Sequence, residues 1–195
     1  IILIALFFLY VEKISKLKLN TIITNITSLG YVIPGAVIGL AVILLFTQFP
    51  LFNNHLLVGS FFVLIYAYVF RFLAVGKSPI KSSLDKQPKA FEDTSKVLGV
   101  SSFKALRTIH LPLNKMALVI AFIVTFIDLL KELPITLILR PFNFDTLSTQ
   151  TYEFAVEEML KASSIYSLMI IVIGSVLLIL LKYITNKQIH AFRSF

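Results

Sequence analysis

The 195-residue sequence contains no cysteine. This absence excludes a disulfide framework, a zinc site with thiolate ligands and an iron-sulfur cluster. Because His55, His110 and His190 lie far apart in the chain, we expect no tightly bound metal ion either. The sequence also lacks a Gly-x-x-x-x-Gly-Lys-Ser/Thr loop that would bind nucleotide phosphates. No nucleophile is paired with a base, so we do not expect an enzyme.

Charged residues are scarce. They make up 14% of the chain, against 57% hydrophobic residues, and the mean hydropathy is +0.90. This composition predicts a protein embedded in a lipid bilayer. The net charge of +8 does not indicate a nucleic-acid partner, because the basic residues gather in the gaps between apolar runs.

Apolar runs predict an all-α polytopic membrane bundle of about five transmembrane helices. The first run has no initiator methionine and no preceding basic residues, so we interpret it as a truncated helix of a longer protein that has lost its N-terminal part. We expect one transmembrane domain over residues 1–195. The predicted spans are residues 1–11, 31–49, 56–75, 116–139 and 165–184.

Lysine and arginine are distributed unevenly among the predicted connections. Most of them fall after the first run, in the loop of residues 77–115 and near the C-terminus, whereas the opposite side carries only Arg140 and Lys161. By the positive-inside rule, we expect the 77–115 loop and the C-terminus in the cytoplasm.

The second predicted span begins with a cluster of glycines and a proline. Gly35 and Gly39 have the small-xxx-small spacing that lets another helix approach closely, and we favour such packing over a gating hinge. Pro34 either bends the span or opens its helix.

The long loop of residues 77–115 has regular apolar spacing. Pro88 suits a first helical turn, and Gly99 can supply a positive-φ stop after it. Ser101 or Ser102 could cap a second short helix before Pro112 helps to start the next span. We therefore predict a helix, a glycine turn and a helix. The residues expected to share a face are Phe91, Thr94, Ser95 and Leu98 in the first helix, and Phe103, Leu106 and His110, with Ile109 beside them, in the second.

Periodicity alone leaves two interpretations of this loop open. A connection of nearly forty residues with apolar spacing suits a folded element presented to a cytosolic partner. Its lysines equally suit an amphipathic hairpin lying on the anionic inner leaflet.

Aligned on Gly99, the loop resembles the EAA loop of binding-protein-dependent ABC importer permeases. That pattern is Glu-Ala-Ala, three residues, Gly, nine residues and Ile-x-Leu-Pro. The spacing is kept here, with aspartate in place of the glutamate and two hydroxyl residues in place of the alanines. The corresponding positions are Asp93, Thr94, Ser95, Gly99, Ile109, Leu111 and Pro112.

A second block is similar to the ferric iron branch of these permeases, which is related to thiamine and phosphonate permeases. It comprises Lys131-Glu132-Leu133-Pro134, the stretch from Leu139 to Leu147, and Tyr152-Glu153. Gly30-Tyr31, Pro34-Gly35 and Arg71-Phe72 also fit that branch. The likeness covers nearly the whole chain, and this part looks like most of the C-terminal half of a permease with two fused halves.

The resemblance implies a transport subunit of the bacterial inner membrane that crosses the bilayer several times. Its implied partners are a cytosolic ABC ATPase dimer, an extracytoplasmic substrate-binding protein and a second permease half, fused or separate. ATP and Mg²⁺ would bind to the ATPase, and no cofactor to this chain. The short helix from Asp93 to Leu98 would seat in the ATPase, so that ATP-driven closure moves the spans.

Three charged residues mark the extracytoplasmic half of the fourth predicted span: Asp128, Lys131 and Glu132 fall on roughly one helical face. Charges at that depth should face protein or a water-filled path. An ion pair between Asp128 and Lys131 with a helix end near Pro134, and direct contact with substrate, both stay open. The candidates for a translocation path or gate are Asp128, Lys131, Glu132, Pro134 and Arg140.

Residues 140–164 are too polar for a full span, and we expect a short extracytoplasmic or re-entrant helix after a turn at residues 141–145. It would form an outer gate, meet the binding protein or cover the spans as a lid. Glu153, Glu157 and Glu158 suit a basic partner surface or a solvated face.

Two rival functions remain open at this point. A permease of the same class could carry thiamine, phosphonate, polyamine or another small solute. An ion-driven secondary transporter would use Asp128 and Glu132 as coupling carboxylates.

Overall fold

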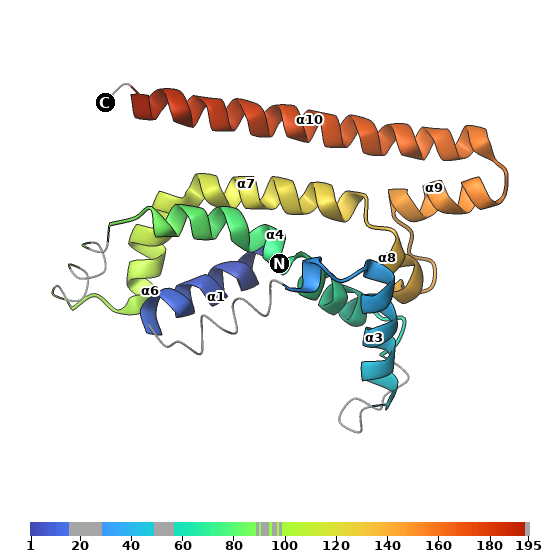
Figure 1. Ribbon diagram of the computed structural model, residues 1–195, viewed down its shortest axis with the longest axis horizontal. Coiled ribbons are helices and arrows are strands. Elements are labelled where there is room, and N and C mark those ends of the chain that lie inside the picture. The colour runs from blue at the N-terminus through green and yellow to red at the C-terminus, as the bar shows by residue number, and fades with distance from the viewer. Residues whose placement is uncertain are drawn as a thin grey trace. The chain divides into compact units, whose positions relative to one another are not determined.

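The computed structural model describes residues 1–15, 29–48, 57–88, 90, 94, 97 and 99–193. Within these residues every regular element is helical (Figure 1), which confirms the predicted all-α membrane fold. The elements are α1 (Ile2–Ser15), the 3-10 turn η1 (Leu29–Tyr31), α3 (Gly35–Gln48), α4 (Phe61–Asp85), α6 (Ser102–Ala105), the π-helical turn η2 (Leu106–His110), α7 (Leu111–Leu130), α8 (Pro134–Leu139), α9 (Leu147–Val156) and α10 (Leu160–Arg193).

In the part of the chain that the structure describes, three helical segments are long and apolar enough to cross a bilayer: Phe61–Asp85, Phe103–Leu130 and Leu160–Asn186. The first and second predicted spans correspond to shorter apolar helices, Ile2–Glu12 and Gly35–Gln48. The 14 residues of α3 cover only about 21 Å, less than the ~30 Å hydrocarbon core.

The chain divides into two compact units, each with its own core. Unit 1 comprises Ile1–Val32 and Phe70–Thr125, and unit 2 comprises Ile33–Val69 and Phe126–Phe195. The single domain expected over residues 1–195 stays a prediction.

Unit 1 is built from α1, the second part of α4, and the helical run from α6 into α7. The helices approach closely at Gly76, because a Cβ atom there would lie 3.1 Å from the Ile2 side chain and 3.2 Å from Oγ1 of Thr125. The apolar side chains that form the core are Ala5, Leu6, Leu9, Leu73, Ile80, Leu84 and Ala121.

The predicted end of the third span at residue 75 is wrong. Helix α4 continues through Pro79 to Asp85, so Lys77 and Lys81 lie on a helix and not in the loop. Packing explains the extension, since Ile80 and Leu84 are buried and Lys81 pairs with Glu12 of α1 at 3.2 Å. These contacts outweigh the hydrogen bond that Pro79 removes from the helix.

The second short helix predicted before Pro112 is not separate from the next span. Residues 102–130 form one helical run, in which the π-turn η2 joins α6 to α7. Pro112 cannot donate a backbone hydrogen bond, and a local change to π geometry is one way to accommodate a proline inside a helix. In that turn the N–H of Leu111 donates to the carbonyl of Leu106.

Unit 2 joins α3, the first part of α4 and α8 in one core made by Ile38, Val42, Phe46, Val63, Leu64, Ala67, Ile135 and Leu139. The packing interpretation of Gly35 and Gly39 is confirmed: a Cβ at Gly39 would lie 3.0 Å from Ile138 of α8, and one at Gly35 would lie 2.8 Å from Oε1 of Glu132. Pro34 opens α3, since its carbonyl accepts from the N–H of Ile38 at 3.2 Å.

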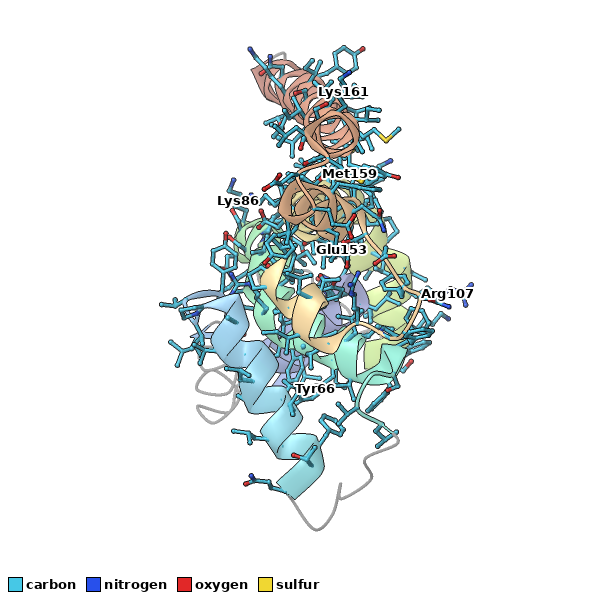
Figure 2. All side chains as sticks on the ribbon, turned by 90° about the vertical axis from the view of Figure 1, so that its right-hand side faces the viewer. Tyr66, Lys86, Arg107, Glu153, Met159 and Lys161 are labelled. Carbon is cyan, nitrogen blue, oxygen red and sulfur yellow. The ribbon has the colours of Figure 1, made fainter. Side chains whose placement is uncertain are left out.

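The expected short helix after the 141–145 turn is confirmed as α9, which reverses into α10 (Figures 1 and 2). The reversal is a Schellman motif: Met159 N–H donates to the Phe154 carbonyl at 2.8 Å and Glu158 N–H to the Ala155 carbonyl at 3.2 Å. Glu158 takes the left-handed φ of 60° that this motif requires. The hydroxyl of Ser163 then ties α10 to the carbonyl of Thr151 at 2.8 Å.

Gly30 supplies a test of the packing in unit 1. A Cβ atom there would collide with the backbone carbonyl of Phe70, which cannot rotate away. We expect Gly30→Ala to destabilise the protein by about 1–3 kcal/mol, as overpacking does. Thermal unfolding of the purified full-length protein in detergent measures this. Gly174→Ala is the matched control, because nothing lies within 4 Å of a Cβ there, and an equal melting shift for both variants would contradict the prediction.

Candidate functional site

The structure describes part of the predicted coupling loop. Asp93, Ser95 and Leu98 lie outside the described residues, while Thr94 is helical and exposed. Gly99 has a φ of +65°, and no atom lies within 4 Å of a Cβ built on it. The predicted glycine stop is therefore confirmed. Glycine is favoured at this position because the backbone has a positive φ, not because a Cβ atom would collide with a neighbour.

The helical run after Gly99 starts as predicted. The hydroxyl of Ser101 accepts from the N–H of Lys104 at 3.4 Å, which makes it the helix cap. Ile109 lies half-buried in the π-turn, and Leu111 and Pro112 open α7, half-buried and exposed respectively.

The sequence predicted His110 only on the apolar face of the second short helix, but the structure places it where three segments of unit 1 meet. It is buried, and its ring packs edge-on against Tyr10 of α1 with centroids 5.7 Å apart. Its Nδ1 lies 3.0 Å from Oε1 of Gln87, just beyond α4. No signal in the sequence links residues 10, 87 and 110.

The fourth predicted span, residues 116–139, is wrong as a continuous helix. Helix α7 ends at Leu130 and α8 begins at Pro134. Lys131 and Glu132 therefore lie beyond the end of α7, and Lys131 is exposed while Glu132 is buried. The expected ion pair is confirmed, with Lys131 Nζ 2.8 Å from Asp128 Oδ1. The helix end expected near Pro134 is confirmed too.

Glu132 holds the broken segment together. Its Oε1 accepts from the N–H of Ile135 at 3.1 Å, one of the donors that the first turn of α8 leaves without a helical partner. Its backbone carbonyl accepts from the hydroxyl of Ser148 at 2.7 Å and from that of Thr136 at 3.1 Å. The break is thus fixed to both α8 and α9.

Two further contacts fix this segment to the rest of unit 2. The hydroxyls of Tyr68 in α4 and Thr136 in α8 lie 2.5 Å apart. The Glu132 carboxylate rests on Gly35 of α3, where any larger residue would displace it. A buried polar cluster therefore connects α3, α4, α8 and α9.

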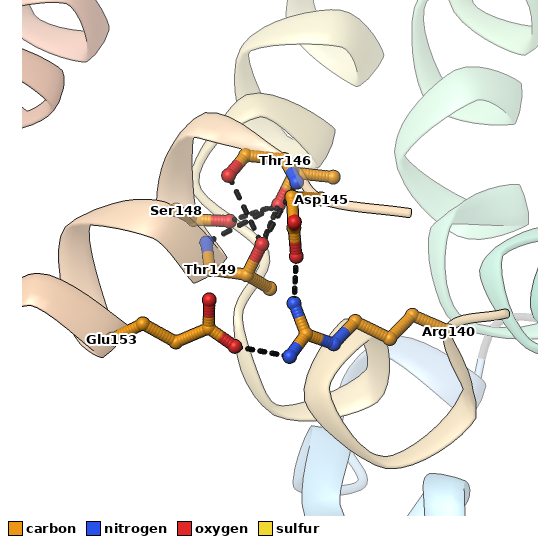
Figure 3. Close-up of polar contacts among 6 residues, drawn as sticks. All are labelled: Arg140, Asp145, Thr146, Ser148, Thr149 and Glu153. Atoms are coloured by element: carbon orange, nitrogen blue, oxygen red, sulfur yellow. Dashed lines mark hydrogen bonds and ion pairs between the residues drawn. The ribbon is translucent and has the colours of Figure 1, made fainter. Parts of the chain in front are cut away.

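Arg140 follows α8 and pairs with one acid before the next helix and one within it (Figure 3). Its Nη1 pairs with Asp145 in the turn and its Nη2 with Glu153 in α9. Glu153 was one of three acids expected on a partner surface or a solvated face. It pairs with Arg140 of the same chain instead. Thr146 caps α9 in a reciprocal capping box with Thr149.

Residues 2–190 match the family model described as binding-protein-dependent transport system inner membrane component. The chain belongs to this family. Family members are transport subunits of the inner membrane, and the three candidate spans agree with a multi-pass protein.

The family match is accompanied by similarity to curated proteins. The chain is 29% identical over 160 residues to the Fe(3+)-transport system permease protein FbpB 2 of Haemophilus influenzae, covering 82% of this chain and 31% of that protein. It is 33% identical over 102 residues to the putative ferric transport system permease protein FbpB 1 of the same organism, covering 52% and 16%. The ferric transport system permease protein FbpB of Actinobacillus pleuropneumoniae is 30% identical over 102 residues, covering 52% and 14%.

The described residues hold no group of three or more histidine, cysteine or acidic side chains that could bind a metal ion. Unit 2 contains a helical path that is interrupted at residues 131–133. The Glu132 carboxylate, the hydroxyls of Thr136 and Ser148 and the two ion pairs of Arg140 hold the segment that follows. In transporters, irregular backbone at membrane depth occurs where it is buried in protein or lines a water-filled cavity. Asp128, Lys131, Glu132 and Pro134 lie at or beside this interruption, whereas Arg140 follows the C-terminal end of α8.

The role of Glu132 is tested by two substitutions. Glu132→Ala leaves the Ile135 N–H without its acceptor, and we expect a loss of about 1–3 kcal/mol, the cost of an unsatisfied buried donor. Glu132→Gln keeps an oxygen at the same place and should retain most of the stability. Melting curves of both purified variants decide: equal destabilisation would show that the charge, not the hydrogen bond, matters.

The Arg140 fork is tested by a double-mutant cycle of Arg140→Gln and Glu153→Gln. The three side chains are 23–36% exposed, so we expect a coupling energy of only about 0.5–1 kcal/mol in thermal stability. Glu157→Gln, at an exposed position one residue after α9, is the control and should not couple to Arg140. If the stability effects of Arg140→Gln and Glu153→Gln simply add, the ion pair between these side chains is refuted.

Proposed function

We propose that this chain forms part of the permease subunit of an ATP-driven ABC importer that moves ferric iron delivered by an extracytoplasmic binding protein. The observation that carries this proposal is the family match over residues 2–190. The substrate is taken from the names of the relatives. Because the chain spans 31% of the length of the Haemophilus influenzae FbpB 2 protein, the activity of the whole protein is part of the proposal.

The proposed partners are a cytosolic ABC ATPase dimer, a substrate-binding protein and a second permease half. In this arrangement the 77–115 region and the C-terminus lie in the cytoplasm, as the lysine distribution predicts. ATP and Mg²⁺ act on the ATPase. The permease converts the closure of that dimer into a change of its own helices.

The proposed contact with the ATPase is the segment from Asp93 to Leu98, followed by Gly99 and the run to Pro112. A coupling element must be stiff, since slack would absorb the displacement. Two features support stiffness after Gly99: the Ser101 cap and the continuous helical run that leads into α7. The proposed translocation path or gate is the interrupted segment with Asp128, Lys131, Glu132, Pro134 and Arg140.

Gly99 provides the sharpest test of coupling. In Gly99→Ala the alanine must adopt φ near +65°, which costs about 1–2 kcal/mol, or the segment must change direction. We expect ATP hydrolysis to continue while iron uptake per ATP falls. The measurement is uptake of labelled ferric iron and phosphate release in vesicles that hold the full-length transporter with its ATPase and binding protein.

Gly59→Ala is the matched control. Gly59 also has a positive φ, +82°, with nothing within 4 Å of a Cβ, but it lies outside the proposed coupling segment. Equal uncoupling by both variants would contradict the assignment of residues 93–112. Uptake without any ATPase that collapses with the proton gradient would instead favour an ion-driven transporter. Thiamine uptake in place of iron uptake would move the protein to another branch of the family.

A further inference from the structure

His110 occupies the one variable position in the Ile-x-Leu-Pro pattern, between Ile109 and Leu111, so the resemblance assigns it no role. Its surroundings are specific. The ring lies against Tyr10 of α1 and within hydrogen-bond distance of Gln87. Its backbone carbonyl accepts from Nδ2 of Asn114 at 2.6 Å, and Asn114 is fully buried. Side chain and backbone of one residue are thus both held inside unit 1.

The backbone around His110 is the part of the helical run least able to stay stiff unaided. Residues 106–110 form a π-turn, and the next residue but one, Pro112, lacks an N–H. Kinks in helices arise at such turns and at prolines. Arg107 (labelled in Figure 2) and Thr108 belong to the same turn and are exposed, so their side chains do not pack in the interior of unit 1.

A displacement that enters at Gly99 must cross this π-turn to reach α7. If the turn bent freely, it would absorb the displacement. The contacts of His110 oppose such bending, because the imidazole is clamped between α1 and the residue that follows α4. Gln87 is itself bonded to α4, because its N–H donates to the Leu84 carbonyl at 3.1 Å, so the turn moves together with α1 and the end of α4.

We propose that His110 is a positioning residue that locks the π-turn to α1 and α4, so that unit 1 receives the movement of the coupling segment as one body. This proposal rests on the proposed function. Its elements are the hydrogen bond to Gln87, the ring contact with Tyr10 and the carbonyl bond from Asn114.

The test uses the full-length transporter with its ATPase and binding protein in lipid vesicles. His110→Phe keeps an aromatic ring for Tyr10 but cannot bond to Gln87, and Gln87→Leu removes the same bond from the other side. We expect each variant to take up roughly 2- to 30-fold less iron per ATP, the range of coupling effects from residues that touch neither ligand. The double variant should be no worse than either single one, because both remove one interaction.

Thr108→Val is the control, since it alters the exposed side of the same turn, where the hydroxyl bonds to the Lys104 carbonyl at 2.7 Å, and leaves Gln87 untouched. It should couple normally. A merely structural role of His110 would lower ATPase co-purification and ATP hydrolysis together with uptake. The proposal expects co-purification and hydrolysis to persist.

The outcomes are separable. Normal uptake per ATP in assembled His110→Phe and Gln87→Leu transporters overturns the lock, as does equal uncoupling by Thr108→Val. If His110→Phe fails to assemble, Gln87→Leu at its half-buried position decides alone. Absence of ATP-dependent iron uptake in the unmodified transporter refutes the proposed function itself, whatever the variants do.

Discussion

The structure of unit 2 depends on satisfying the backbone where its helix breaks. Residues 131–133 interrupt α7 and α8, and each unpaired N–H or C=O in an apolar environment costs several kcal/mol. Glu132 meets this requirement twice, with its carboxylate toward Ile135 and its carbonyl toward the hydroxyls of Ser148 and Thr136. The glycine at position 35 follows from the same constraint, because only a residue without a Cβ leaves room for that carboxylate.

Unit 1 solves a related problem in a different way. There the helix is not broken at its proline but widened into a π-turn, so the chain continues as one run from Ser102 to Leu130. A break gives a short helix that neighbouring side chains must hold, whereas a π-turn keeps the backbone helical across the proline. The interrupted segment is held by several hydrogen-bonding or ionic side chains, among them Glu132, Ser148 and Arg140, whereas the buried residue of the π-turn is His110.

The sequence was sufficient for the features that depend on local chemistry. Hydropathy predicted the membrane class, the left-handed stop at Gly99 and the Ser101 cap followed from single residue types, and i to i+3 spacing predicted the Asp128–Lys131 pair. Features that depend on tertiary contacts were not predictable. Phe103 and His110 were expected on one face, yet Phe103 is 75% exposed and His110 4%. The i to i+5 bond of the π-turn inserts an extra residue, which rotates the following residues by about 100° and shifts the helical phase.

Helix α10 raises a matter of dimensions. Its segment Leu160–Asn186 has 27 residues, with Lys161 and Lys182 near the two ends. Residues 162–181, between these lysines, measure about 30 Å at a rise of ~1.5 Å per residue, close to the ~30 Å hydrocarbon thickness of an average bilayer. A thinner bilayer is therefore met by tilt of the helix or by local thickening of the lipid. The inclination of α10 is therefore sensitive to acyl-chain length, and the lipid composition of the host membrane becomes a physical variable of this protein.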